Sequence, residues 1–214
     1  MRFKAAHFLL PVAAATTLML CAGPTRAAPA TDDEVAKVNA AGHALKSNVT
    51  IGGKTYGHAV SMINAPIAAV RKELTAYGQY KTLVPDKFSN VRVISKEGAN
   101  TEVYMQVPIM HGLVSLWQVL KFGAPQQISP GVEVLEGKFV KGNVKDANIV
   151  FTMRALGDDF TVLTCDILIV PNVPAPQAAI DEELRDSALK AVDALHTRAQ
   201  GGVARTLACS IPAK

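Results

Sequence analysis

Residues of the kinds that carry catalysis occur along the chain, but they do not form a recognised catalytic motif. The segment Gly53-Lys54-Thr55 matches the end of a phosphate-binding loop, yet that motif needs a glycine five places before Gly53, where Asn48 stands. A turn is the better interpretation of this segment. The sequence has no Gly-x-Ser-x-Gly motif, and Cys165 has no activating base close to it in the sequence. Nucleophilic catalysis therefore has no support in the sequence.

The histidines that follow residue 30 do not form a metal-binding pattern. They are scattered, and no two of them have the spacing of metal ligands: His43, His58, His111 and His196. We therefore expect no metal and no cofactor.

Polar side chains inside apolar strands are the remaining candidates for chemistry, and the sequence contains six: Tyr104, Gln106, Trp117, Gln118, Arg154 and Asp166. Any of them that faces an interior could hydrogen-bond a ligand or, in a cyclase, polarise a carbonyl and accept a proton. Side chains alternate between the two faces of a strand, so Tyr104 and Gln106 lie opposite Met105. Arg154 likewise alternates away from Met153. These three should face outward if the apolar residues face inward.

Three segments with apolar residues at helical spacing are expected to be helices: residues 31–47, 64–78 and 181–200. A short helical turn is expected at residues 80–83. The pair Gly201-Gly202 should end the last helix and leave a tail at residues 201–214.

Runs of strand length, apolar or alternating, make up most of the rest: residues 49–51, 55–63, 91–94, 103–107, 114–122, 132–140, 147–154 and 160–170. Short polar turns separate most of them, which is typical of an antiparallel meander. A connector with three prolines follows at residues 171–176. The order of helices and strands predicts a single α+β domain.

The first 27 residues have the order of a secretory signal. Arg2 and Lys4 come first, an apolar stretch follows at residues 5–22, and Thr25 and Ala27 are small residues at −3 and −1 of a cleavage site. A retained membrane anchor and a lipid-modified cysteine are the alternatives. The sequence predicts cleavage and export, to the periplasm or out of the cell, with no membrane span afterwards.

Removal of this signal changes the meaning of the charge. The whole chain has a formal charge of +4 and a pI near 9.0, which would suit a nucleic-acid partner. The signal holds three of the 22 basic residues and no acidic one, so the remainder has a charge of only +1. No run of like charges is left, and we expect no binding to nucleic acid.

Two cysteines remain after the signal, Cys165 and Cys209. An even pair in an oxidising compartment is compatible with a disulfide. Whether these two meet stays open.

One stretch has a family resemblance. It reads Ile63-Asn64-Ala65-Pro66-Ile67-Ala68-Ala69-Val70, then Leu74-Thr75-Ala76-Tyr77-Gly78-Gln79-Tyr80 and Leu83-Val84-Pro85. With the order of elements, it resembles the START/Bet v 1-like (SRPBCC, helix-grip) superfamily, particularly the polyketide cyclase and coenzyme Q-binding branch, over residues 55–200. The chain departs from that pattern at Arg71, where tryptophan is frequent, and at Ala76, where aspartate is frequent.

The resemblance implies a curved antiparallel sheet wrapped around the long C-terminal helix, with an extra N-terminal helix. It divides the chain into the signal at residues 1–27, a helical extension at 28–47, the START/Bet v 1-like domain at 48–200 and the tail. Between sheet and helix it implies an apolar cavity, lined by one face of each strand and by the helix: Val103, Met105, Val107, Ile109, Leu116, Leu120, Phe122, Ile149, Phe151, Met153, Leu163, Cys165, Ile167, Ile169, Leu184, Ala188, Ala191 and Leu195. The alternative is that these residues pack together as a dry core.

The function implied is binding or carrying of a small lipophilic molecule, such as a lipid, sterol, quinone or polyketide, with transient membrane contact allowed. A cyclase or dehydratase acting on a hydrophobic carbonyl compound in the same cavity is the alternative. A third hypothesis is an interaction module whose cavity is closed. The ligand and the oligomeric state stay open.

Overall fold

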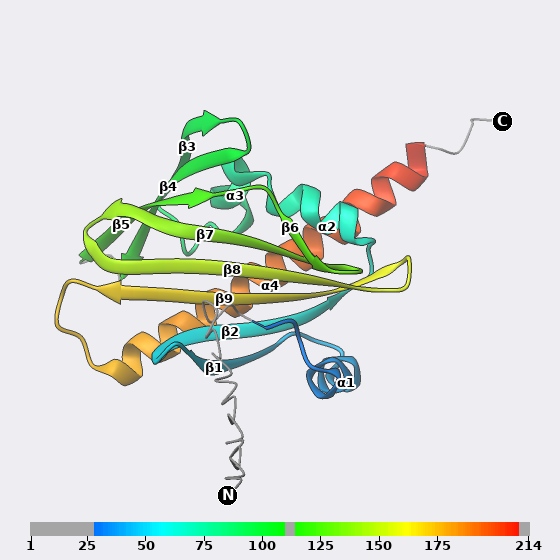
Figure 1. Cartoon of the computed structure of the whole chain (residues 1–214), viewed down its shortest axis with the longest axis horizontal. Coiled ribbons are helices and arrows are strands. Elements are labelled where there is room, and N and C mark those ends of the chain that lie inside the picture. Colours follow the sequence, from blue (N-terminus) through cyan, green and yellow to red (C-terminus); the bar gives the residue numbers. More distant parts are fainter. Residues whose placement is uncertain (1–27, 110–113, 210–214) are drawn as a thin grey trace, which may run out of the picture.

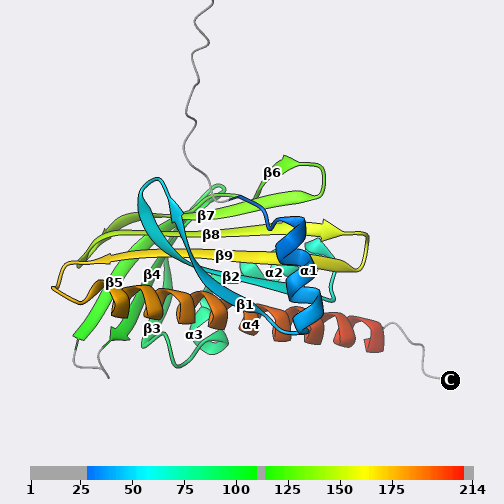
Figure 2. The same cartoon turned by 90° about the horizontal axis from the view of Figure 1, so that it is seen from below.

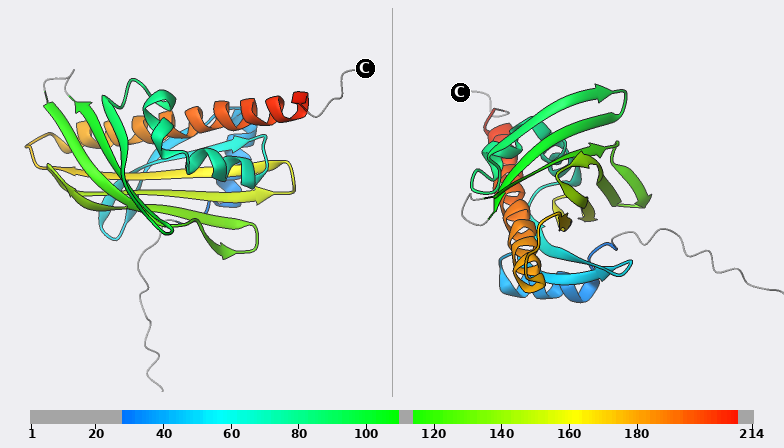
Figure 3. Two further views of the ribbon diagram at one scale, coloured as in Figure 1. Left: turned by 90° about the horizontal axis from the view of Figure 1, so that it is seen from above. Right: turned by 90° about the vertical axis from the view of Figure 1, so that its left-hand side faces the viewer.

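The computed structural model describes residues 28–109 and 114–209, with residues 202–209 as backbone only. The expected signal at residues 1–27 and His111 lie outside the described residues. In the described part, one antiparallel sheet of nine strands curves around a long helix, and Figure 3 shows this helix closing the open side of the curve. The predicted α+β architecture, with a curved sheet, a C-terminal helix and an extra N-terminal helix, is confirmed.

The N-terminal helix α1 (Asp32–Ala41) begins at a capping box. The Glu34 amide donates to the Thr31 hydroxyl over 3.2 Å, and the Glu34 carboxylate accepts from the Thr31 amide over 2.8 Å. Gly42 ends the helix with a φ of 68°, a conformation that favours glycine. The predicted helical extension to residue 47 is wrong, because Leu45 already pairs with Val60 in the sheet.

The strands follow one another as hairpins, with one long-range pairing. Their order in the sheet is β1-β2-β9-β8-β7-β5-β4-β3, with β6 paired to β7 off this path (Figure 1). The β2–β9 pairing is the long-range one. The bounds are β1 (Leu45–Ile51), β2 (Lys54–Ile63), β3 (Asn90–Glu97), β4 (Asn100–Ile109), β5 (Val114–Phe122), β6 (Gln126–Ser129), β7 (Val132–Gly142), β8 (Val144–Leu156) and β9 (Phe160–Pro171). The short, exposed β6 lacks the apolar pattern of the others and was not predicted.

The C-terminal helix α4 (Gln177–Cys209) crosses the concave face of the sheet (Figure 2). With 33 residues it is about 50 Å long. The predicted end at Gly201-Gly202 is wrong, since the helix continues to Cys209. A glycine costs a helix only about 1 kcal/mol, and it ends one when it turns left-handed, which Gly201 does not.

Three short helical segments lie between β2 and β3: α2 (Ile67–Leu74), the 3-10 helix η1 (Tyr77–Gln79) and α3 (Tyr80–Leu83). They pack on the same concave side as α4. The Tyr77 ring lies 4.7 Å from the Phe122 ring of β5. Gly137 leaves room for the Phe122 ring, because a Cβ at position 137 would come within 2.5 Å of that ring. This end of the sheet is therefore filled by a packed core.

Helix α1 covers the opposite, convex face of β2 and β9. Val38 packs against Val60 and Val162. Below the helix, His58 Nδ1 lies 2.6 Å from the buried Asp166 carboxylate, and His58 Nε2 lies 3.4 Å from Glu34 of α1. The three side chains form a buried charge cluster that connects α1 to two strands.

This cluster predicts that the stability of the fold depends on pH. Burial lowers the pKa of His58. The hydrogen bond and charge of Asp166, together with Glu34, raise this pKa by more than burial lowers it, so the net pKa lies above its ordinary value. A raised pKa stabilises the fold below the unfolded value of about 6.5, and this stabilisation is lost as the pH rises through the folded value.

We therefore expect the free energy of unfolding, measured with urea, to fall as the pH rises from about 6 to about 9. A His58→Gln variant should flatten this slope. A His43→Gln variant is the matched control, because His43 is exposed and bonds only the Ala41 carbonyl. An unchanged slope in His58→Gln would contradict the assignment.

Candidate functional site

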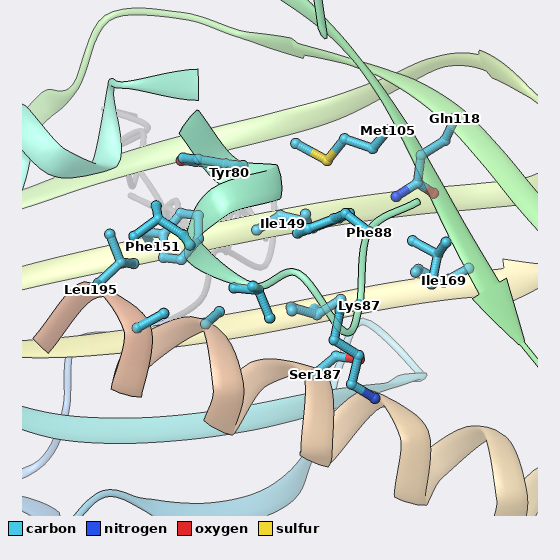
Figure 4. Close-up of a pocket in the computed structure, with 16 residues that line it drawn as sticks. Tyr80, Lys87, Phe88, Met105, Gln118, Ile149, Phe151, Ile169, Ser187 and Leu195 are labelled. Carbon is cyan, nitrogen blue, oxygen red and sulfur yellow. The ribbon is translucent and has the colours of Figure 1, made fainter. Parts of the chain in front are cut away.

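A hollow lies on the concave side, between α4, the segment of residues 80–88 and strands β4, β5, β8 and β9 (Figure 4). Its wall is almost wholly apolar. Tyr80, Phe88 and Phe151 supply aromatic rings, and Ala191 and Ala194 of α4 supply small side chains. Its cavity volume is about 70 Å³. We call it the first hollow.

A second hollow continues from the first toward the β9–α4 connector. The two share Val107, Ile169 and Ser187, so they are neighbours along the same stretch of α4. The second hollow has a cavity volume of about 230 Å³ and is lined by Val173 and Ala175 of the connector, among others. Together they form an apolar path that runs under α4 to the surface.

Most of the predicted cavity residues line one of these hollows. The first hollow has Met105, Val107, Ile149, Phe151, Ile167, Ile169, Ala191 and Leu195. The second has Val107, Ile109, Leu116, Ile169 and Leu184.

The other predicted residues line neither hollow and pack in the core: Val103, Leu120, Phe122, Met153, Leu163, Cys165 and Ala188. The strand residues among them point to the same face of the sheet as the lining residues, so alternation alone does not separate the two groups. The difference arises from α2, η1 and α3, whose side chains fill the space above these residues, as Tyr77 does above Phe122. The hollows therefore extend along only part of the concave face.

Gln118 is the polar side chain that enters the first hollow from the sheet. It shares a face of β5 with Leu116 and Leu120, and it is only 3% exposed. Its Oε1 has no hydrogen-bond partner among the described residues. In Figure 4 its amide points into the space between Phe88 and Ile169.

The other polar strand residues face away from the hollows. Tyr104 and Trp117 stack at 5.9 Å on the outer face, and Gln106 donates to Ser115 over 2.8 Å. Arg154 donates to the Ala30 carbonyl beside α1, and Asp166 binds His58. The outward orientation predicted for Tyr104, Gln106 and Arg154 is confirmed.

Sequence reasoning missed the residues that close the first hollow from the side: Leu83, Val84, Lys87 and Phe88. They belong to α3 and the segment after it, which have no strand pattern that would point to an interior. Lys87 forms an ion pair with Glu183 of α4, and Ser187 lies 3.5 Å from the same carboxylate. Polar groups thus hold this segment to α4 where the two hollows meet.

The titratable groups of the first hollow are engaged with protein atoms. The Tyr80 hydroxyl donates to the Leu74 carbonyl, and burial raises the pKa of Tyr80 well above its ordinary value. The Lys87 ammonium is paired with Glu183. Among residues 28–109 and 114–201, no group of three or more histidine, cysteine, aspartate or glutamate side chains could hold a metal ion.

Cys165 is buried, and the side chain of Cys209 lies outside the described residues, so the disulfide considered for the two stays a prediction. Burial also raises the pKa of the Cys165 thiol well above its ordinary range, which keeps it protonated and unreactive.

Several solved structures share this fold. A STAR-related lipid transfer protein from Xanthomonas axonopodis aligns with a TM-score of 0.63 and 12% identity over 73% of this chain and 93% of that chain. Human StAR-related lipid transfer protein 5 aligns with a TM-score of 0.58 and 10% identity over 73% and 86%. The chain has a START-like helix-grip fold. A START superfamily protein from Mycobacterium smegmatis also matches, with a TM-score of 0.55 and 13% identity over 74% and 98%. No protein-family model and no curated protein sequence matches the chain.

Within the START-like fold, one of the two departures from the pattern of the resembled superfamily has a structural role. Arg71 stands where tryptophan is frequent, and its Nε lies 2.8 Å from Glu133, which ties α2 to β7. Ala76 stands where aspartate is frequent, at the cap of η1, and it makes no side-chain capping bond. The chain therefore holds this corner of the START-like fold with an ion pair.

In the described part of this START-like chain, no helix has both the length and the apolar character needed to cross a membrane.

Proposed function

We propose that the chain is an exported carrier that binds a small lipophilic molecule in the first and second hollows. The observation that carries the proposal is the apolar path between sheet and α4, which is formed by side chains of β4, β5, β8, β9 and α4 and opens to the surface. Apolar burial contributes about 25 cal/mol per Å², so hiding about 300 Å² of a ligand would contribute roughly 7 kcal/mol before the costs of association. Two of the similar solved structures are of lipid transfer proteins, which supports this proposal.

The cyclase or dehydratase alternative needs titratable groups that converge on a bound carbonyl compound. The titratable side chains that line the first hollow, Tyr80 and Lys87, are both bonded to protein groups instead. The Asp166–His58 pair lies on the convex face, away from the hollows. We therefore favour a carrier.

Export is supported by the sequence of residues 1–27. Cell fractionation followed by N-terminal sequencing tests it. We expect the protein outside the cytoplasm with a new N-terminus near Ala28; an intact chain in the cytoplasm would contradict this.

The binding proposal is tested on protein purified without detergent from its own cells. Native mass spectrometry should show a bound mass that organic solvent extracts. The stripped protein should then bind a fluorescent lipophile, and unlabelled sterols, quinones or fatty alcohols should displace it. Protein that is always empty, and that binds none of these compounds, would refute the proposal.

A further inference from the structure

The Gln118 amide oxygen, which has no hydrogen-bond partner among the described residues, indicates the class of ligand. Gln118 pairs with Met105 in the sheet register, and its side chain enters a wall of apolar groups. Because a buried amide without a partner destabilises a protein, a leucine of similar size would suit an empty cavity better. The hollow thus contains a hydrogen-bonding group that the described protein atoms do not satisfy.

The neighbouring hydroxyls are directed elsewhere. The Tyr80 hydroxyl donates to the Leu74 carbonyl, and the Ser187 hydroxyl lies against Glu183. Neither hydroxyl therefore bonds the Gln118 amide oxygen, and a molecule that enters the hollow can reach it. The atom without a partner is the acceptor Oε1, so it matches a ligand hydroxyl, which donates.

The charged groups around the first hollow favour an uncharged ligand over an anionic one. Lys87 is the cation that lines the first hollow, and its ammonium is paired with Glu183. Figure 4 shows the Lys87 side chain running toward α4, away from the Gln118 amide. A carboxylate or phosphate placed at Gln118 would lose its hydration without gaining a cation, which is strongly unfavourable.

We propose that Gln118 is a specificity-determining residue that selects uncharged lipophiles with a hydroxyl group at the end that enters the first hollow. The inference rests on the proposed carrier function and adds the chemical class of its ligand. The apolar remainder of such a molecule would lie along Val107 and Ile169, toward the second hollow.

The test uses three probes of one chain length, hexadecane, hexadecanol and hexadecanoate, each competing with a bound fluorescent lipophile at about pH 8. We expect hexadecanol to bind better than hexadecanoate. In a Gln118→Leu variant, the ratio of the hexadecanol Kd to the hexadecane Kd should rise at least about tenfold, because the hydroxyl loses its partner while the hydrocarbon does not. Gln106→Leu, on the outer face of β4, is the matched control and should leave the ratio unchanged.

The outcomes separate the two proposals. If none of the three probes binds, the carrier proposal fails. If they bind but the ratio is the same in the wild type and in Gln118→Leu, or hexadecanoate binds better than hexadecanol, only the role of Gln118 is refuted. The empty Gln118→Leu protein should also have a higher Tm than the empty wild type. A lower Tm would show that the amide already has a partner, and it would overturn the inference.

Discussion

An Ala191→Phe variant is expected to lose lipophile binding by a factor of about 100 or more while keeping its fold. Ala191 lies half-buried on α4, and its methyl group forms part of the wall of the first hollow. A phenyl ring there would occupy the space that the ligand needs. Filling an apolar hollow also adds packing contacts, so we expect the Tm of the variant to stay near that of the wild type.

Fluorescent lipophile titration and thermal unfolding measure the two properties separately. Ala178→Phe is the control, because Ala178 is an exposed residue on the same helix. It should bind as the wild type does. Wild-type binding by a folded Ala191→Phe protein would place the ligand outside the first hollow and would contradict the proposed site.

A Gly57→Ala variant is expected to lose about 1–3 kcal/mol of stability or more. Gly57 lies on β2 where α4 crosses it, and a Cβ there would come within 2.1 Å of the Leu184 carbonyl carbon and 2.5 Å of the Arg185 amide nitrogen. Those atoms belong to the helix backbone and cannot rotate away as a side chain would. The alanine methyl group fits only if α4 moves away from the sheet, and that movement would also distort the hollows.

Urea unfolding followed by circular dichroism measures this loss. Gly78→Ala is the matched control, because a Cβ at Gly78 meets no atom within 4 Å and its backbone is not left-handed. We expect its free energy of unfolding to stay within about 0.5 kcal/mol of the wild type. Equal stability of the two variants would mean that helix and sheet do not approach as closely as described.

Local patterns predicted the architecture well, because long strands and amphipathic helices leave strong periodic signals. The local patterns failed where a tertiary contact overrides the local preference. Leu45 fits a helical stripe, but pairing with Val60 holds it in a strand. Gly201 looks like a helix stop, but it takes a helical conformation inside α4.

The candidate site was predictable in part. Alternation identified which residues face the concave side, and the same rule places Gln118 with Leu116 and Leu120; an expectation restricted to apolar residues omits it. The rule does not tell a hollow from a packed core. That depends on how Tyr77 and its neighbours settle over Phe122, which is a contact between segments far apart in the sequence.

The pairing of β2 with β9 determines when during synthesis the sheet can be completed. β9 is inserted between the early strand β2 and the late strand β8, so the two halves of the sheet stay separate until residues 160–171 arrive. Helix α4, which closes the hollows, follows even later. Contacts between such distant segments slow folding, and no binding space exists on a partly synthesised chain. A ligand can therefore enter the hollows only after folding, through their mouth at the surface.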